Sequence, residues 1–337
     1  MMSEPIHPNR PANTPPHAPL AQFGFAWFVP VMGWIGLTMA WFQSPRSEPG
    51  IPMGAQLGTW MSVGVFALVL VTNLLRAWRH PHALLADLRH PVRMAFTASF
   101  AIALILLGAL GTIWGLAEHA WVQATWWAGS LLEFSITVWV MSRCLRPADA
   151  GGLGWPAITP LLMIPIVGNV LVPLAGLHWP VSGWMSAQFG LGLFLWPLIV
   201  GVLLARLLQV GPLPARMTPT LFILVAPPSA IGLALLQWTA PPVLVWGCWG
   251  IACLSMLWAL SQWRVIVGLP FGMPHWGMSF PLAAFSALCL RLGQLPDGVW
   301  MQGPGLLALW ITTGVILWLS FKSLQGLIDG HLLQPEG

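Results

Sequence analysis

Residues 164–176 read IPIVGNVLVPLAG, and this segment carries the clearest structural information in the chain. It has no charged side chain, and its two prolines, Pro165 and Pro173, each remove a backbone donor and kink a helix. In lipid, a carbonyl freed by proline must find another partner or face a water-filled cavity. The segment therefore predicts a kinked transmembrane helix beside a cavity.

The composition of the whole chain agrees with a membrane location. Charged residues make up 7% of the 337 residues, and AVILMFWYC residues make up 57%. A soluble domain carries about 25% charged residues, so this chain has too few polar groups to cover a water-exposed surface. The composition predicts an all-α integral membrane protein.

Ten apolar runs follow one another with short connections, and each is about as long as a bilayer-spanning helix of roughly 20 residues. The runs cover residues 23–42, 56–76, 93–116, 121–143, 157–177, 183–207, 218–238, 242–262, 274–294 and 302–324. We expect a disordered cytoplasmic tail over residues 1–22, one transmembrane domain over 23–325, and a short cytoplasmic tail over 326–337. The N-terminal tail lacks the apolar core of a signal peptide.

The basic residues select an orientation for these runs. With the N-terminus inside, the outer side holds only Arg46 and Arg291. The inner side then holds eleven basic residues, namely Arg10, Arg76, Arg79, Arg89, Arg93, Arg143, Arg146, Arg206, Arg216, Arg264 and Lys322. By the positive-inside rule, both termini are predicted to be cytoplasmic in a multi-pass protein of the cell inner membrane. These basic residues lie singly, so nucleic-acid binding is not expected.

Prolines gather in the odd-numbered runs. They include Pro30, Pro165, Pro173, Pro227 and Pro281, whereas the even runs have little central proline besides Pro197. Kinks in alternate helices favour an inner layer around a central pathway. Ordinary proline enrichment in membrane helices is the alternative.

Four motifs resemble those of a known family. They are HPVRMAF at 90–96, the segment at 164–176, PTLFILVAPP at 219–228, and SFPLAA at 279–284. A looser match is WFVPVMG at 27–33. Their order and spacing resemble the tellurite-resistance/dicarboxylate transporter family, which includes bacterial TehA and the plant slow-type anion channels.

The resemblance implies five helical hairpins in a quasi-fivefold ring around a pore, with odd helices inside, and a homotrimer in the cell inner membrane. It also implies anion permeation gated by a phenylalanine, at the position of Phe280. Candidates for pore lining on the odd runs are Pro30, Pro165, Asn169, Pro173, Phe222, Pro227, Pro281 and Ala284. The alternative is a proton-coupled carrier of C4-dicarboxylates such as malate, or an exporter of tellurite or sulfite.

Two polar residues inside the runs admit two interpretations each. Glu133 shares a helical face with Ser130 and Thr137. It is either a structural, hydrogen-bonded acid or a proton-coupling site, since an intramembrane carboxylate is a functional candidate by default. Asn169 is either an interhelical hydrogen-bond donor or a pore-lining residue.

Two arginines are candidates for attracting anions at the pore mouths. Arg93 lies at the cytoplasmic start of the third run, although it also fits simple membrane anchoring. Arg291 lies eleven residues after Phe280, which is three helical turns and about 20°. It therefore shares the face of Phe280, or it snorkels to the headgroups instead. We expect small anions and lipid as partners, no metal or other cofactor, and no enzyme activity.

Overall fold

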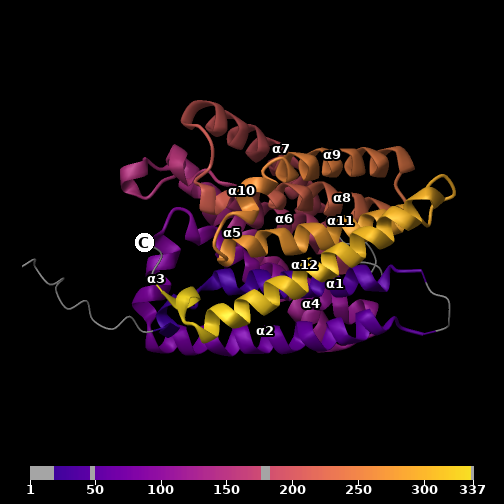
Figure 1. Ribbon diagram of the computed structural model, residues 1–337, viewed down its shortest axis with the longest axis horizontal. Helices are drawn as coiled ribbons and strands as arrows, with labels where there is room; N and C mark the ends of the chain where they lie inside the picture. Colours follow the sequence, from indigo (N-terminus) through magenta and orange to yellow (C-terminus); the bar gives the residue numbers. More distant parts are fainter. Residues whose placement is uncertain (1–18, 46–49, 176–182, 335–337) are drawn as a thin grey trace, which may run out of the picture.

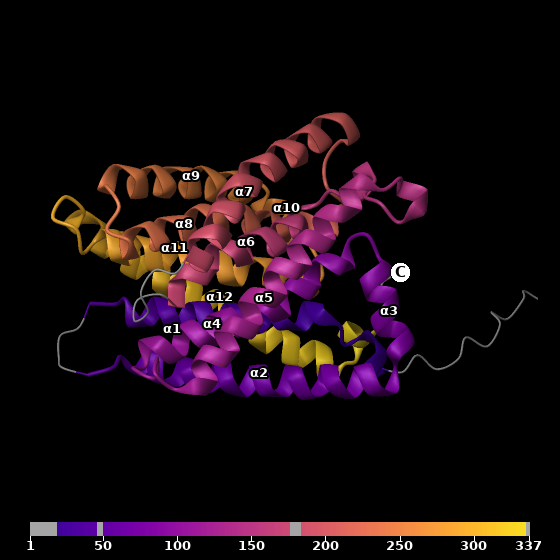
Figure 2. The same ribbon diagram turned by 180° about the vertical axis from the view of Figure 1, so that it is seen from behind.

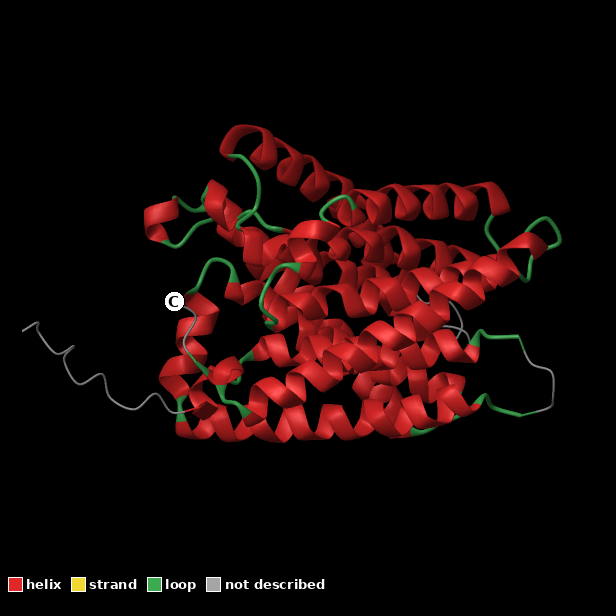
Figure 3. Cartoon of the chain, viewed as in Figure 1, coloured by secondary structure: helices red, strands yellow, loops and turns green. Residues whose placement is uncertain are grey.

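The computed structural model describes residues 19–45, 50–175 and 183–334. Among these residues every regular element is helical, as Figure 3 shows. The predicted tails cover residues 1–22 and 326–337, of which 1–18 and 335–337 lie outside the described part. Inside it, residues 19–22 form a short 3-10 helix, and the last long helix continues to Ile328. The predicted domain boundaries stay predictions.

Each of the ten expected runs overlaps one α-helix, of 8 to 28 residues. These are α1 (Phe28–Phe42), α2 (Met53–Arg79), α4 (Thr97–Ile113), α5 (Ala120–Ser142), α6 (Ile164–Leu171), α7 (Gly183–Val210), α8 (Ala226–Gln237), α9 (Pro242–Leu260), α11 (Ser279–Leu292) and α12 (Gln302–Ile328). The shorter α-helices are α3 (Pro81–Arg89) and α10 (Trp263–Val267). The 3-10 helices are η1 (Pro19–Gln22), η2 (Phe25–Trp27), η3 (Arg93–Phe96), η4 (Arg143–Leu145), η5 (Ala148–Ala150), η6 (Trp155–Ala157), η7 (Pro160–Met163), η8 (Val172–Ala175), η9 (Ala215–Val225), η10 (Met273–Met278), η11 (Val299–Met301) and η12 (His331–Leu333).

Seven described helical segments are long and apolar enough to cross a membrane. An eighth apolar helix, Pro160–Ala175, is shorter. The all-helical, multi-span class is thereby confirmed. The count of ten spans stays a prediction, because α5 carries Glu133 and several other polar residues, and α11 has only 14 residues.

The prolines of the odd runs mark a change of helix type. Pro30, Pro165, Pro227 and Pro281 all lie in the first turn of an α-helix that a 3-10 helix precedes. A proline is tolerated there because its missing N–H has no partner within the helix anyway. The predicted kinks are therefore 3-10-to-α junctions, whereas Pro197 lies inside α7.

The helices form two layers. Three helical segments, Phe25–Phe42, Arg93–Ile113 and Ala215–Gln237, are largely buried: 72 to 83% of the residues in the most apolar 18-residue stretch of each are buried. In α2, α7, α9 and Val299–Ile328 the corresponding share is only 17 to 28%. The exposed residues of the second group are largely apolar, such as Leu68 and Phe194, so lipid is their natural solvent. The inner layer expected from the proline pattern is confirmed for these three odd runs.

The inner helices contact one another in a definite order. Helix α1 packs against α4 and α11, α6 packs against α4 and α8, and α8 packs against α11. Figures 1 and 2 show α2 along one outer edge and α7 and α9 along the opposite one, with the inner helices between them. The short helix α3 lies at one end of the bundle, together with the contact between η1 and η12. We call this the basic end.

Candidate functional site

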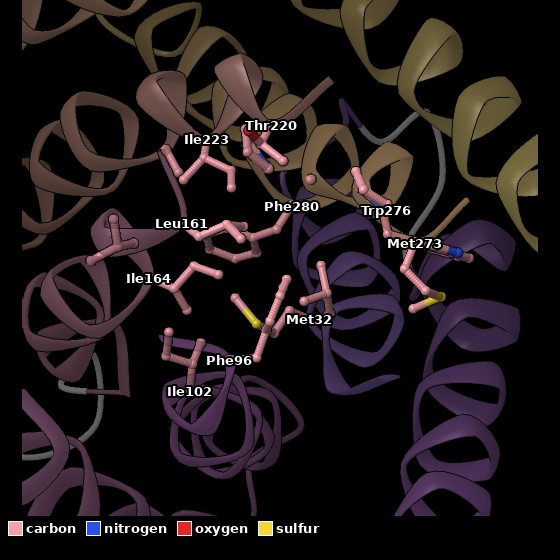
Figure 4. Close-up of a pocket in the computed structure, with 16 residues that line it drawn as sticks. Met32, Phe96, Ile102, Leu161, Ile164, Thr220, Ile223, Met273, Trp276 and Phe280 are labelled. Atoms are coloured by element: carbon pink, nitrogen blue, oxygen red, sulfur yellow. The ribbon is translucent and has the colours of Figure 1, made fainter. Parts of the chain in front are cut away.

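A cavity of about 30 Å³ lies where the five inner segments meet. Its lining comes from Val29 and Met32 in α1, Phe96 in η3 and Ile102 in α4, Leu161, Ile164 and Val167 in η7–α6, Thr220, Ile223 and Ala226 in η9–α8, and Met273, Pro274, Trp276, Gly277, Phe280 and Pro281 in η10–α11. Figure 4 shows these side chains converging from the surrounding helices. The lining is almost entirely apolar.

The ring of Phe280 projects into the middle of this group, between Leu161, Ile164 and Met32 (Figure 4). Only 5% of Phe280 is exposed. Behind the ring lies Gly36 of α1, where an added Cβ would stand 3.0 Å from Cδ2 of Phe280. The ring of Phe280 therefore packs closely against the α1 backbone at Gly36, where a larger residue would require the ring to shift.

The size of the cavity defines the state of the structure. A cavity needs roughly 10–15 Å³ to hold one water molecule, so about 30 Å³ leaves room for very few. The apolar walls offer no replacement for the hydration shell of an ion.

A larger, polar cavity of about 370 Å³ lies at the basic end. We call it the vestibule. Its lining shares five residues with the central cavity, so the two adjoin, and these residues are Phe96, Leu161, Thr220, Met273 and Pro274. The charged side chains of the vestibule are Arg76, Arg93, Arg216 and Asp87.

The ion pairs of the vestibule leave a positive balance. Arg76 is buried, and its Nη2 lies 2.6 Å from Oδ2 of Asp87. Its Nε also donates to the carbonyl oxygen of Ala21, which fixes the N-terminal segment over this end of the bundle. Arg93 is 42% exposed, and its Nε lies 3.4 Å from Oδ1 of Asp87. Among the described residues, the lining of the vestibule thus holds three arginines and one aspartate, and an excess of basic side chains raises the local concentration of anions.

The predicted pore residues divide into two groups. Phe280 and Pro281 line the central cavity, and Arg93 lines the vestibule. The other candidates are buried but are absent from the central lining, namely Pro30, Pro165, Asn169, Pro173, Phe222, Pro227 and Ala284. Phe222 instead lines an apolar groove of about 1210 Å³ beside α9 and α12. Their pore-lining roles stay predictions.

Most of the apolar lining lies outside the residues predicted from the sequence. Three lining residues directly precede predicted prolines, namely Val29, Ile164 and Ala226 before Pro30, Pro165 and Pro227. In the sequence, Arg76 and Arg216 indicate only orientation, and the structure shows that both line the vestibule.

The remaining polar candidates lie outside the linings of the central cavity and the vestibule. The amide nitrogen of Asn169 donates to Thr137 of α5, which supports the interhelical alternative. Glu133 is fully buried in the same contact between α5 and α6. Arg291 is half-buried near the end of α11, far from the vestibule lining.

These features define a class: a multi-span helical membrane protein whose inner helices enclose an apolar constriction next to a basic vestibule. A model of the SLAC1 family, described as voltage-dependent anion channel, matches residues 22–324. The chain belongs to this family, and the predicted relationship to the slow-type anion channels is confirmed. It is therefore an anion channel or transporter rather than an enzyme.

Two uncharacterized transporters of Methanocaldococcus jannaschii are similar to the chain. One is 25% identical over 295 residues, which cover 80% of this chain and 84% of the relative. The other is 28% identical over 254 residues, covering 68% and 71%.

Proposed function

We propose that the protein conducts small anions across the cell inner membrane along a path from the vestibule through the central cavity, and that Phe280 closes this path. The observation that carries the proposal is the position of the Phe280 ring among all five inner segments. A flat apolar ring in a narrow passage excludes water, and such constrictions gate by dewetting.

The order of helix contacts supports a ring around this path. Following the contacts from α1 to α4, α6, α8 and α11 leads back to α1. With one outer helix for each inner helix, this arrangement corresponds to ten spans in five hairpins. We extend the proposal to a homotrimer with both termini in the cytoplasm, which places the vestibule on the cytoplasmic side.

Anion selectivity follows from two features in series. The vestibule arginines concentrate anions by long-range attraction, which salt weakens within a Debye length of about 10 Å at 0.1 M. The apolar constriction then admits only ions that lose water at low cost, and large, weakly hydrated anions meet this condition. We therefore expect iodide and nitrate to pass faster than chloride.

The experiment is reconstitution of the purified protein into liposomes loaded with chloride, nitrate or iodide, with efflux measured by ion-selective electrodes. We expect slow efflux for the wild type and fast efflux for Phe280→Ala. The matched control is Phe189→Ala. Phe189 is similarly buried, but it lies on the outer helix α7, where it packs against Trp238. Equal efflux from the three proteins, all folded, contradicts the gate.

A second candidate is a proton-coupled carrier of organic acids, with C4-dicarboxylates, tellurite and sulfite as substrates to compare. The vestibule favours this candidate, since about 370 Å³ lined by arginines suits a dicarboxylate better than a single chloride. Malate uptake that a pH gradient accelerates, together with alkalinisation of the source compartment, would select the carrier over the channel.

A further inference from the structure

A cluster of buried polar side chains joins α5 to α6 next to the central cavity. Nδ2 of Asn169 donates to Oγ1 of Thr137 at 2.7 Å and to the carbonyl oxygen of Pro165 at 2.9 Å. The hydroxyl of Thr137 in turn donates to the carbonyl oxygen of Glu133 or of Pro165. Both protons of the Asn169 amide group are thus used.

The same cluster extends to α7 through Ser130. Nε1 of Trp184 donates to Oγ of Ser130 at 2.6 Å. Nε2 of Gln188 donates to the carbonyl oxygen of Ser130 at 3.0 Å and to its Oγ at 2.7 Å. The N–H groups of both α7 side chains are therefore also used.

What remains in the cluster is an excess of acceptors. Within the described residues, Oε1 and Oε2 of Glu133, Oδ1 of Asn169 and Oε1 of Gln188 are buried without a hydrogen-bond partner. An ionised carboxylate only accepts hydrogen bonds, whereas a carboxylic acid also donates one. A proton on Glu133 supplies the donor that this set of oxygens lacks.

Within the part of the chain that the structure describes, the surroundings of Glu133 hold no charge that stabilises an anion. Its exposed fraction is 0%. The elements packed against α5 here, α4, α6 and η8, contain no ionisable side chain. On α7 the single charged residue is Arg206, 18 positions beyond Gln188 or about 27 Å along the helix. Arg143 and Cys144 lie in η4, beyond the end of α5. An unpaired carboxylate in such a site takes up a proton rather than remain charged.

The carboxyl group also touches the wall of the proposed path. An added Cβ on Gly168 would overlap the Glu133 carboxyl, so the acid rests directly against the α6 backbone. Gly168 follows Val167, which lines the central cavity. The charge state of Glu133 and the position of α6 are therefore physically linked.

We propose that Glu133 is a proton-binding site whose bound proton holds α5, α6 and α7 together behind the central cavity. With the proton present, the neutral acid donates to one of the two unpaired amide oxygens. When the proton leaves, a carboxylate without a counter-charge lies in a cluster with more acceptors than donors, since the Ser130 hydroxyl is the one donor left over, and α6 moves away from α5 to admit water. This inference rests on the proposed function only where α6 is taken as a wall of the permeation path.

Infrared spectroscopy of the full-length protein in lipid, in D₂O, tests the site directly. At about pH 8, we expect the carbonyl band of a protonated carboxylic acid in the wild type and its loss in Glu133→Gln. The matched control is Glu118→Gln, because Glu118 is exposed in the connection between α4 and α5 and its loss leaves the band in place. If Glu133→Gln does not fold, Glu133→Asp serves instead and must shift the band.

Thermal unfolding gives a second readout. The native state holds one proton that the unfolded chain releases above the usual titration range of glutamate at about pH 4.3, so the unfolding equilibrium constant rises with pH, by up to about tenfold per pH unit, for as long as the native state keeps its proton. We expect the melting temperature to fall with pH in the wild type and in Glu118→Gln, and to stay level in Glu133→Gln. A wild type without the band overturns the site, and a pH slope that persists in Glu133→Gln overturns the link to packing. Neither readout needs transport, so both remain decisive if no anion flux is found.

Discussion

Replacing Phe280 by alanine is the most direct perturbation of the proposed gate. The ring is 5% exposed and lies against Gly36 on one side and the central cavity on the other. For the wild-type path to open, the ring must swing away from α1 and become wetted. In Phe280→Ala the ring is absent, so opening requires no free energy for moving and wetting it.

The size of the effect follows from the area involved. A buried phenylalanine covers about 150–250 Å², and opening exposes roughly half of that area. At about 25 cal/mol per Å² the swing costs about 2–3 kcal/mol. Since about 1.4 kcal/mol is a factor of ten, we expect anion flux to rise about 30- to 140-fold in Phe280→Ala.

The assay is single-channel or macroscopic current in planar bilayers, with Phe189→Ala as the control for lost core packing. Each substitution removes a buried aromatic ring and is expected to cost about 3–5 kcal/mol of stability, less at Phe280 because a cavity already adjoins the ring. A folded Phe280→Ala protein whose current stays within twofold of the wild type refutes the reasoning, because the ring then contributes nothing to the free-energy barrier to opening.

Four further predictions test other parts of the structure. Gly36→Ala places a methyl group 3.0 Å from Phe280, so we expect about 1–3 kcal/mol of destabilisation and an altered anion current. The effect of Gly36→Ala on the current should disappear in the Phe280→Ala background, and an equal effect in both backgrounds argues against a shared contact. Asp87→Asn removes the counter-charge of the buried Arg76 and is expected to lower the free energy of unfolding by about 3 kcal/mol, measured by thermal melting. An unchanged melting curve would contradict this expectation. Arg291→Gln is expected to reduce anion entry from the outside at low ionic strength and to match the wild type at high ionic strength; equal flux at low salt rejects a role at the outer mouth. Cys144 is exposed, and partial burial of its thiol raises the pKa, so labelling by a membrane-impermeant maleimide should require a higher pH than for a free thiol. It should occur in inside-out vesicles rather than right-side-out ones, and the opposite sidedness would invert the proposed topology.

Local sequence determined the helices and their layering well. The bilayer sets the length and polarity of every span, so an apolar run bounded by polar residues is a complete signal for a membrane helix. Proline acts on its own backbone, and for this reason Pro30, Pro165 and Pro281 marked real changes of helix type. Phe280, which the motif at 279–284 marks as a candidate, lies in the lining of the central cavity, and its role as a gate stays a prediction.

What the sequence alone determined, then, is that the chain is a multi-span helical membrane protein with a proline-marked inner layer. Which residues face the cavity was decided only by tertiary structure. An inner helix is apolar on every side, so no polar face reveals its rotation about its own axis. In α1 that rotation is set by contact with α11, where Gly33 and Gly36 make room for Ser279 and Phe280. The same applies to Glu133, whose hydrogen-bond deficit appears only when three helices bring their acceptors together.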